Sequence, residues 1–180
     1  MASKPLPCPT LLRQILSLED GVLIWRARPL WMFQTPGQQV AWNRQFAGSP
    51  VSLAPKEKGY FRIRLLGVKH VYLHRVLFAL YHGRWPDGPV DHRNGNPADN
   101  SEDNLREATV KQNGQNKSGY GKTSRFRGVY RDRNLWQVKC SDPTGNNRYI
   151  GKFKCETEAA LAYDKAAREW HGEFARLNFP

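Results

Sequence analysis

The region from residue 124 to 180 carries the pattern that most constrains the fold. Three short runs rich in β-branched and aromatic residues, 125–131, 135–141 and 147–153, are separated by two turn-like segments. A helix is predicted after them over 156–172, ending at Gly172, and one stripe of it holds Ala159, Ala160, Tyr163, Ala166, Ala167 and Trp170. The pattern predicts a small three-stranded antiparallel sheet packed on one helix.

The distribution of charge indicates which side of that sheet faces a partner. The chain has a formal charge of +12 and a pI near 9.9. Residues 118–155 hold nine Lys and Arg against two acids, whereas residues 156–180 hold three against five. The sheet is therefore basic and its helix slightly acidic, which favours a polyanion on the open face of the sheet. A basic protein that is merely kept soluble by its charge is the alternative.

Several classes of protein are excluded or disfavoured by composition. No apolar run approaches the roughly 20 residues of a membrane span, and the N-terminus lacks the apolar core of a secretory signal. Cys8, Cys140 and Cys155 are odd in number and have no paired spacing, so neither a disulfide framework nor a cysteine zinc site is expected. We expect a cytoplasmic protein that contacts no membrane.

The first half of the chain has weaker secondary-structure signals. A short helix over 11–18 and a strand over 21–28 are predicted, followed by an ordered loop over 32–59 that is rich in Gly, Pro and Gln. Residues 60–65 alternate between apolar and basic side chains, which predicts a half-buried strand. Gly67 turns the chain into a hairpin with 70–74, and a helix over 75–83 ends at Gly83.

The stretch from residue 91 to 116 is rich in asparagine and begins with an Asp-His pair. Phosphodiester hydrolysis needs a base that activates water and a hard cation with oxygen ligands, which Asp91, His92 and a nearby amide could supply. An imidazole ordinarily titrates near pH 6.5, which suits a general base. Asn94, Asn96 and Asn100 have the form of turn residues. A polar loop with one surface histidine is the alternative.

A helix should begin beyond this loop, because Thr109 and Gln112 have the spacing of a capping box. It carries Asn113 and Asn116, which are three residues apart and so lie on nearly one face.

Residues 60–117 resemble the HNH nucleases, in the Asn-rich form common among phage and intron-encoded homing endonucleases. The resemblance implies that His92 deprotonates the attacking water, that Asp91 and Asn113 hold one Mg²⁺ or Mn²⁺, and that Asn104 fixes the loop that orients His92. It also implies 5′-phosphate and 3′-hydroxyl products. Arg106 or Lys111 is expected to contact phosphate. The paired cysteines of zinc-stabilised members are absent, so the core must be stabilised by side-chain packing alone.

Residues 124–180 resemble the DNA-binding domain of plant APETALA-two/ethylene-response factors, from "RGV" through "IGKF" and "EAALAYDKAA" to "LNFP". The resemblance implies a sheet in the major groove. Lys139 and Tyr149 replace the usual acid and Trp, so plant target specificity should not transfer. For Trp136, packing within the sheet is the alternative to a DNA contact. The implied contact residues are Arg127, Arg131, Arg133, Trp136, Lys139, Arg148, Tyr149 and Lys152.

The predicted fold class is α+β, with a ββα-metal (HNH) nuclease core followed by a small three-stranded antiparallel sheet packed on one helix. We expect a basic N-terminal region over 1–59 that belongs to the nuclease, the core over 60–117, a linker over 118–123 and the DNA-binding domain over 124–180. The predicted function is metal-dependent cleavage of double-stranded DNA in a phage context. A non-catalytic DNA-binding regulator with a degenerate nuclease module is the alternative. The sequence leaves the oligomeric state open.

Overall fold

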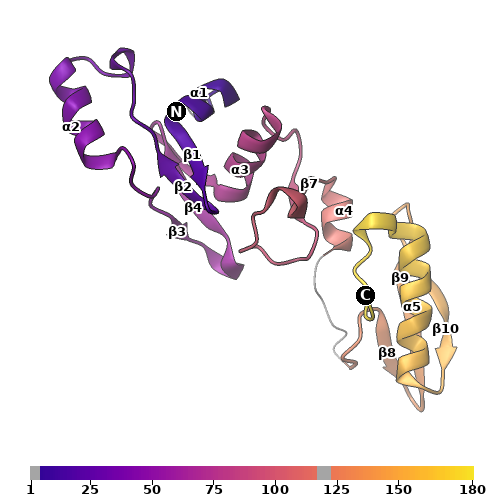
Figure 1. Cartoon of the computed structure of the whole chain (residues 1–180). Coiled ribbons are helices and arrows are strands. Elements are labelled where there is room, and N and C mark those ends of the chain that lie inside the picture. The colour runs from indigo at the N-terminus through magenta and orange to yellow at the C-terminus, as the bar shows by residue number, and fades with distance from the viewer. Residues whose placement is uncertain (1–4, 117–122) are drawn as a thin grey trace. The chain divides into compact units, whose positions relative to one another are not determined.

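A computed structural model of the chain describes residues 5–116 and 123–180. The chain divides into two compact units, Met1–Arg106 and Glu107–Pro180, and each is described by itself (Figure 1). The division precedes the predicted linker, most of which lies outside the described residues. Among the helices that the structure describes, none combines the length and the apolar character needed to cross a bilayer.

The first unit combines short helices with small antiparallel sheets. Strands β1 and β2 pair as a hairpin, β3, β4 and β5 form a three-stranded sheet in that order, and β6 pairs with β7, whose last residue opens the second unit. Its helices and strands are α1 (Pro9–Ile15), β1 (Leu16–Glu19), β2 (Val22–Trp25), η1 (Leu30–Met32), α2 (Pro36–Phe46), β3 (Ala54–Pro55), η2 (Glu57–Gly59), β4 (Phe61–Leu65), β5 (Val68–Tyr72), α3 (Leu73–His82), β6 (Val90–His92), η3 (Glu102–Asn104) and β7 (Leu105–Glu107).

The core of this unit is formed by side chains of α1, the β1–β2 hairpin, β4, β5 and α3. Ile63 and Leu65 of β4 are buried while Arg64 is exposed, so the alternation predicted for this strand is confirmed. Helix α3 ends at Gly83 as predicted, because Gly83 adopts the left-handed conformation at its C-cap. The predicted helix over 11–18 is too long: α1 ends at Ile15, and Leu16 begins a strand that pairs with β2.

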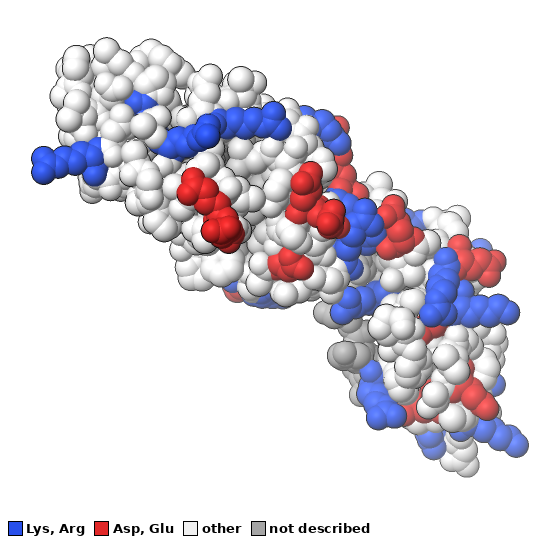
Figure 2. All heavy atoms as spheres, viewed as in Figure 1, with Lys and Arg blue, Asp and Glu red and all other residues white. Residues whose placement is uncertain are grey.

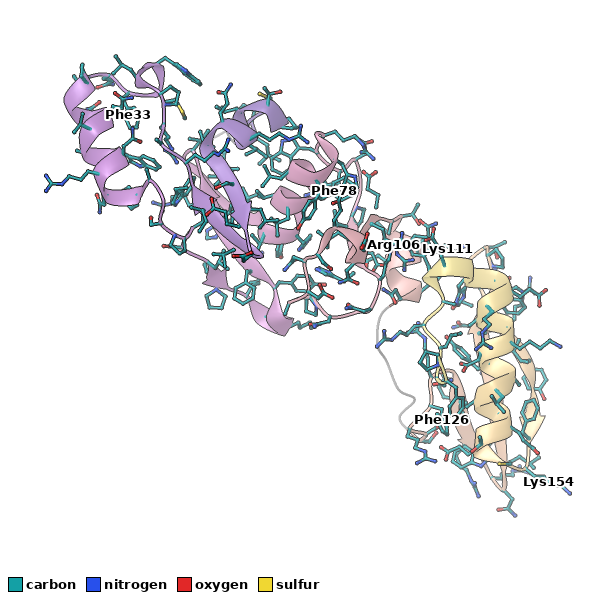
Figure 3. The ribbon with its side chains drawn as sticks, viewed as in Figure 1. Phe33, Phe78, Arg106, Lys111, Phe126 and Lys154 are labelled. Carbon is teal, nitrogen blue, oxygen red and sulfur yellow. The ribbon has the colours of Figure 1, made fainter. Side chains whose placement is uncertain are left out.

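Helix α2 lies within the region that the sequence predicts to have little regular structure. Thr35 caps it by accepting a hydrogen bond from the backbone of Gln38, and Pro36 occupies its first turn. Proline is compatible with that position because the first N–H groups of a helix have no partner within it. Trp42 anchors α2 through ring contacts with Trp25 and with Phe33, which Figure 3 labels beside the helix.

The second unit has the predicted sheet and helix, although its first strand begins at Val129 and not at residue 125. Strand β9 lies between β10 and β8, all antiparallel, and α5 covers one face of the sheet (Figure 1). The predicted stripe of α5 is confirmed as core, packed against Val129, Val138 and Cys140. The unit comprises α4 (Val110–Gln115), β8 (Val129–Asp132), β9 (Leu135–Ser141), β10 (Asn147–Phe153), α5 (Glu156–His171) and η4 (Gly172–Phe174).

The C-terminal "LNFP" segment is fastened to α5 by Asp164, whose side chain is fully buried. The Asp164 carboxylate accepts hydrogen bonds from the backbone N–H groups of Asn178 and Phe179, both at 2.8 Å. The Asn178 side chain in turn exchanges two hydrogen bonds with the backbone of Arg127. A buried carboxylate thus ties the chain terminus to the start of the sheet.

Candidate functional site

Asp91 and His92 lie at the end of β6, next to its partner strand β7, and both are buried. The Asp91 Oδ2 atom accepts a hydrogen bond from Arg106 Nε at 2.9 Å and lies 2.8 Å from a second guanidinium nitrogen of the same residue. Figure 3 labels Arg106 on β7. The expectation that Arg106 contacts phosphate is wrong, because its side chain is 6% exposed and forms a buried ion pair.

Two rings contact the His92 ring, and a third ring stacks on one of them. The rings of Tyr60 and His74 meet it edge-on, with centroids 5.9 and 5.3 Å away, and Tyr72 stacks on His74 at 5.3 Å. Burial, followed by the nearby charges of His92 and Arg75, lowers the pKa of His74 to about 4, so this imidazole is neutral at neutral pH. No sequence pattern singled out His74, which was predicted to end the strand over 70–74 and instead lies in the first turn of α3.

Tyr60 connects the environments of the two β6 residues. Its ring contacts the His92 ring, and its pKa is raised first by burial and then by the negative charges of Asp91 and Tyr72. Asp91 and His92 therefore act on one shared neighbour although they are consecutive in a strand. Consecutive residues within a strand point to opposite faces, but at the end of a strand both side chains can approach the same neighbour.

The loop after His92 is held in place by its own asparagines. The Asn104 side chain accepts from the backbone N–H of Asn94 at 2.9 Å and donates to the carbonyl of Asp99 at 2.6 Å. The side chains of Asn94 and Asn96 accept from backbone N–H groups two residues ahead, which confirms the turn chemistry expected of them. Asn104 thus spans the loop and joins its beginning to its far side.

Asn100 has a different role from the turn residue that the sequence predicts. Its side-chain oxygen lies 3.2 Å from His92 Nε2, while its NH₂ group donates to the carbonyls of Ala98 and Pro97 at 3.2 and 3.5 Å. Asn100 therefore links the loop directly to the imidazole. No local sequence pattern indicates this contact, because it depends on how the loop folds back over the strand end.

Asn113, the other predicted metal ligand, lies on α4 in the second unit. The capping box predicted for this helix is confirmed, with both reciprocal hydrogen bonds of Thr109 and Gln112 present. The joint action of Asp91 and Asn113 at one cation stays a prediction. Within residues 5–116 and 123–180, no three His, Cys, Asp or Glu side chains come together as a metal site, and a carboxylate with an amide is a donor set of another kind.

The open face of the C-terminal sheet follows from the strand register. Val129, Val138 and Cys140 point into the core beneath α5, so the intervening side chains point away from it. Cross-strand partners on this open face are Tyr130 with Gln137, Gln137 with Lys152, and Lys139 with Tyr149. Tyr149 is 56% and Tyr130 41% exposed. Figure 2 shows basic side chains protruding from this unit, with acidic side chains among them.

Three of the eight predicted DNA contacts, Lys139, Tyr149 and Lys152, lie on this open face. Lys152 also forms an ion pair with Asp132 at 2.5 Å. Tyr130 belongs to the same face and the resemblance did not select it, although its alternation with Val129 was a usable signal.

The structure places the other five predicted contacts elsewhere in the unit. Trp136 packs against the core, with the Arg131 guanidinium 4.7 Å from its ring centre. Arg131 also donates to the carbonyl of Arg133, which lies in the turn between β8 and β9. Arg127 is half-buried and donates to the Tyr163 hydroxyl at 2.7 Å. Arg148 forms an ion pair with Asp142 at 2.7 Å.

Two arginines of the first unit are also engaged within the protein. Arg28 stacks over Trp42 at 3.7 Å, and burial lowers its pKa. Arg62 donates to the Tyr72 hydroxyl at 2.7 Å. Arg26 and Arg64 have exposed side chains, and Arg26 also donates to the carbonyl of Arg13 at 3.0 Å.

Comparison with known proteins finds two kinds of similarity. Residues 71–115 match a family model described as HNH endonuclease. The chain is also 44% identical over 57 residues to the dehydration-responsive element-binding proteins 2C and 2A of Arabidopsis thaliana, and 45% identical over 58 residues to the ethylene-responsive transcription factor LEP of the same plant. These matches cover 31% of this chain and 17%, 17% and 28% of the relatives. Residues 71–115 thus match an HNH endonuclease model, and about a third of the chain is similar to plant proteins that are named as element-binding proteins or as a transcription factor.

Proposed function

We propose that this protein is a metal-dependent endonuclease that hydrolyses phosphodiester bonds of double-stranded DNA. The observation that carries the proposal is the pair at the end of β6, within the residues that match the HNH model. The Asp91 carboxylate is oriented by Arg106, and the His92 imidazole is held by Asn100 and two rings. Chemistry of this class requires such fixed groups.

This activity requires a divalent cation, and the two predicted ligands are of the chemical type that such an ion prefers. A carboxylate and an amide are the hard oxygen donors that Mg²⁺ and Mn²⁺ prefer, and Asp91 and Asn113 would supply them. The ion pair with Arg106 engages Oδ2 of Asp91, and a carboxylate has a second oxygen that can bind a metal. The ion would neutralise charge on the phosphate and on the leaving oxygen.

His92 would act as the general base. Its ring takes a proton from a water molecule, and the water oxygen forms a bond to phosphorus as the bond to the 3′ oxygen of the preceding nucleotide breaks. That oxygen leaves and is protonated, which gives 3′-hydroxyl and 5′-phosphate ends. Asn104 and Arg106 would not touch the reacting atoms, because they hold the loop and the carboxylate in position.

The C-terminal sheet would bind the DNA substrate. Its open face combines the Lys139 ammonium with the exposed rings of Tyr130 and Tyr149, a combination suited to phosphates and base edges. Similarity to proteins named for binding a DNA element supports this assignment. A phage origin and a homing role remain parts of the proposal that rest on the resemblance alone.

The decisive experiment is incubation of supercoiled plasmid with purified protein and Mg²⁺ or Mn²⁺. We expect nicked or linear product from the wild type and none from His92→Ala, with DNA binding unchanged. His82→Ala is the matched control, because His82 is an exposed histidine at the end of α3 and should leave cutting intact. Equal cutting by His92→Ala and the wild type would remove His92 as the base.

A second candidate function is DNA binding without cleavage, as in a transcriptional regulator. The similarity to proteins named as transcription factors favours it. A DNA footprint that needs no metal, together with plasmid that stays supercoiled in both ions, would establish this alternative. Metal-dependent cutting that His92→Ala abolishes would exclude it.

A further inference from the structure

We propose that the outer face of α2 is a DNA-contacting surface, in addition to the C-terminal sheet. This face consists of Gly37, Val40, Ala41 and Arg44. The inference rests on the proposed function for the nature of its partner, which is the same double-stranded DNA. The geometry and the charge that support it lie wholly within the first unit.

The inner face of α2 is committed to contacts within the protein. The side-chain amides of Gln39 and Asn43 both donate to the backbone carbonyl of Arg28 at 3.0 Å, and Asn43 also accepts from the Arg28 N–H at 2.8 Å. The Arg28 guanidinium stacks over Trp42, whose ring centroid lies 5.2 Å from that of Phe46. These helix residues are three or four positions apart, so they share one side of α2. Their contacts determine which side of the helix faces outward.

The outer face of α2 is open to solvent. Its four residues repeat the same spacing on the opposite side of the helix, and all four are exposed, Val40 to 63%. No residue of α2 is buried. Figure 1 shows α2 at one end of the first unit and β7 at the other. A helix fastened on one side and open on the other can contact a second molecule without rearrangement of the unit.

The charge around α2 indicates that this molecule is a polyanion. Residues 21–56 contain Arg26, Arg28, Arg44 and Lys56 but no Asp or Glu. On the face of the molecule in Figure 2, no acidic side chain lies over α2. Arg44, on the outer face itself, presents an exposed guanidinium that can donate two hydrogen bonds to one phosphate. The major groove of DNA, about 12 Å wide, admits an α-helix.

A second copy of this chain fits the outer face of α2 poorly. A symmetric contact between two copies places the same surface of each against the other. Arg44 would then lie near the identical residue of the other copy, and neither helix carries an acidic side chain to compensate for the repulsion. Double-stranded DNA, by contrast, presents negative charge along its whole length. DNA is therefore the partner that the charge of this face selects.

The first experiment detects the contact directly. In the full-length protein Val40 is replaced by the photoreactive residue benzoylphenylalanine, and the variant is irradiated with a labelled linear duplex in buffer with EDTA, which prevents cutting. We expect a protein–DNA crosslink. The same replacement of Leu161, which is 52% exposed on α5, is the control and should give little crosslink. A crosslink between two protein chains at position 40, without one to DNA, would assign the face to a second copy and overturn the proposal.

The second experiment measures how binding depends on charge at this face. Arg44→Ala should lower the slope of log affinity against log salt concentration by about 1, because one phosphate contact is lost. Arg84→Ala is the matched control, since it removes another exposed arginine of the same unit and should leave the slope unchanged. Ala41→Glu should weaken binding by about tenfold relative to Ala41→Gln, which adds similar bulk without the charge. Circular dichroism checks that all four variants are folded.

The outcomes separate this inference from the proposed nuclease activity. Equal slopes for Arg44→Ala and the wild type, or equal affinities for the two Ala41 variants, overturn the inference even if the wild type cuts plasmid normally. A lowered slope in Arg44→Ala, together with a wild type that cuts nothing in Mg²⁺ or Mn²⁺, overturns the proposed nuclease and leaves the DNA contact of α2 intact. A wild type that binds no DNA overturns both.

Discussion

At the scale of single residues, the ion pair between Asp91 and Arg106 illustrates how burial determines the free-energy cost of losing one of two paired charges. The side chains are 5% and 6% exposed, so neither charge can be solvated once its partner is removed. Removal of one partner from a buried pair leaves an uncompensated charge, which costs far more than the pair itself contributes. Arg106 should therefore support stability and the orientation of Asp91 together.

We expect Arg106→Ala to lower the free energy of unfolding by about 3–5 kcal/mol and to abolish nicking. Chemical denaturation of the full chain measures the first effect and a plasmid assay the second. Arg84→Ala is the matched control, since Arg84 belongs to an exposed pair with Asp87 at 3.7 Å and should change neither quantity appreciably. Equal unfolding midpoints for the two variants would show that the Asp91 pair is not buried in solution.

Gly128 provides a second test of a single residue. Its φ of +71° is unfavourable for other residues, and an added Cβ would lie 2.1 Å from the Tyr163 ring and 2.7 Å from the Lys139 carbonyl oxygen. Gly128→Ala should destabilise the second unit by about 2 kcal/mol or more. Gly114→Ala, in open space on α4, should be neutral or slightly stabilising. Thermal unfolding of both variants decides between these expectations.

At the scale of elements, the sequence predicted best where one face of an element is buried along its whole length. The stripe of α5 and the alternation of β9 leave regular patterns because each packs on a single core. Helix α2 has no buried residue, so it leaves no such pattern, and its Pro and Gly imply a loop when they are read without their position in the first turn. Its cap at Thr35 was the signal that could have identified it.

The candidate site was predictable in part for a related reason. Asp91, His92 and Asn104 belong to a local motif, so their roles could be proposed from its resemblance to HNH nucleases. Arg106 pairs with a residue 15 positions away across β6 and β7, and Asn100 reaches His92 only after the loop has folded. Contacts of this kind depend on strand pairing and loop closure, which no short window of sequence contains.

The hairpin between β9 and β10 depends on one carboxylate. Asp142 accepts hydrogen bonds from the Thr144 hydroxyl and from the backbone of Thr144 and Asn146, and it pairs with Arg148. The Thr144 hydroxyl, followed by Arg148, holds the pKa of Asp142 well below its usual range. Because the unfolded chain binds the proton more readily, the stability that Asp142 contributes is present above about pH 4 and is lost as the pH falls toward the folded pKa.

We therefore expect the melting temperature of the wild type to fall below about pH 4 more steeply than that of Asp142→Asn, which cannot titrate at this position. Circular dichroism melts at a series of pH values measure the difference. The two curves should converge at low pH, where the wild-type carboxyl is also neutral. Parallel curves across the acid range would show that the Asp142 hydrogen bonds do not favour its charged form.

At the scale of the whole molecule, the two units divide the proposed activity. The predicted base and one predicted metal ligand belong to the first unit, while the second carries the open basic sheet and Asn113 on α4. Binding and cutting should then respond to different substitutions. Affinity that depends on phosphate contacts falls as salt rises, with a slope set by the number of contacts. The slope of DNA affinity against salt concentration therefore measures phosphate contacts, among them those that the sheet makes.

Lys139→Ala should reduce that slope by about 1 and weaken DNA binding, because Lys139 lies on the open face of the sheet. At protein concentrations that saturate the DNA, its nicking rate should equal that of the wild type. His92→Ala should show the opposite behaviour, with an unchanged slope and no nicking. Lys165→Ala is the control for charge, since Lys165 is exposed on α5, which covers the other face of the sheet. A slope lowered equally by Lys139→Ala and Lys165→Ala would mean that net charge, and not this face, attracts the DNA.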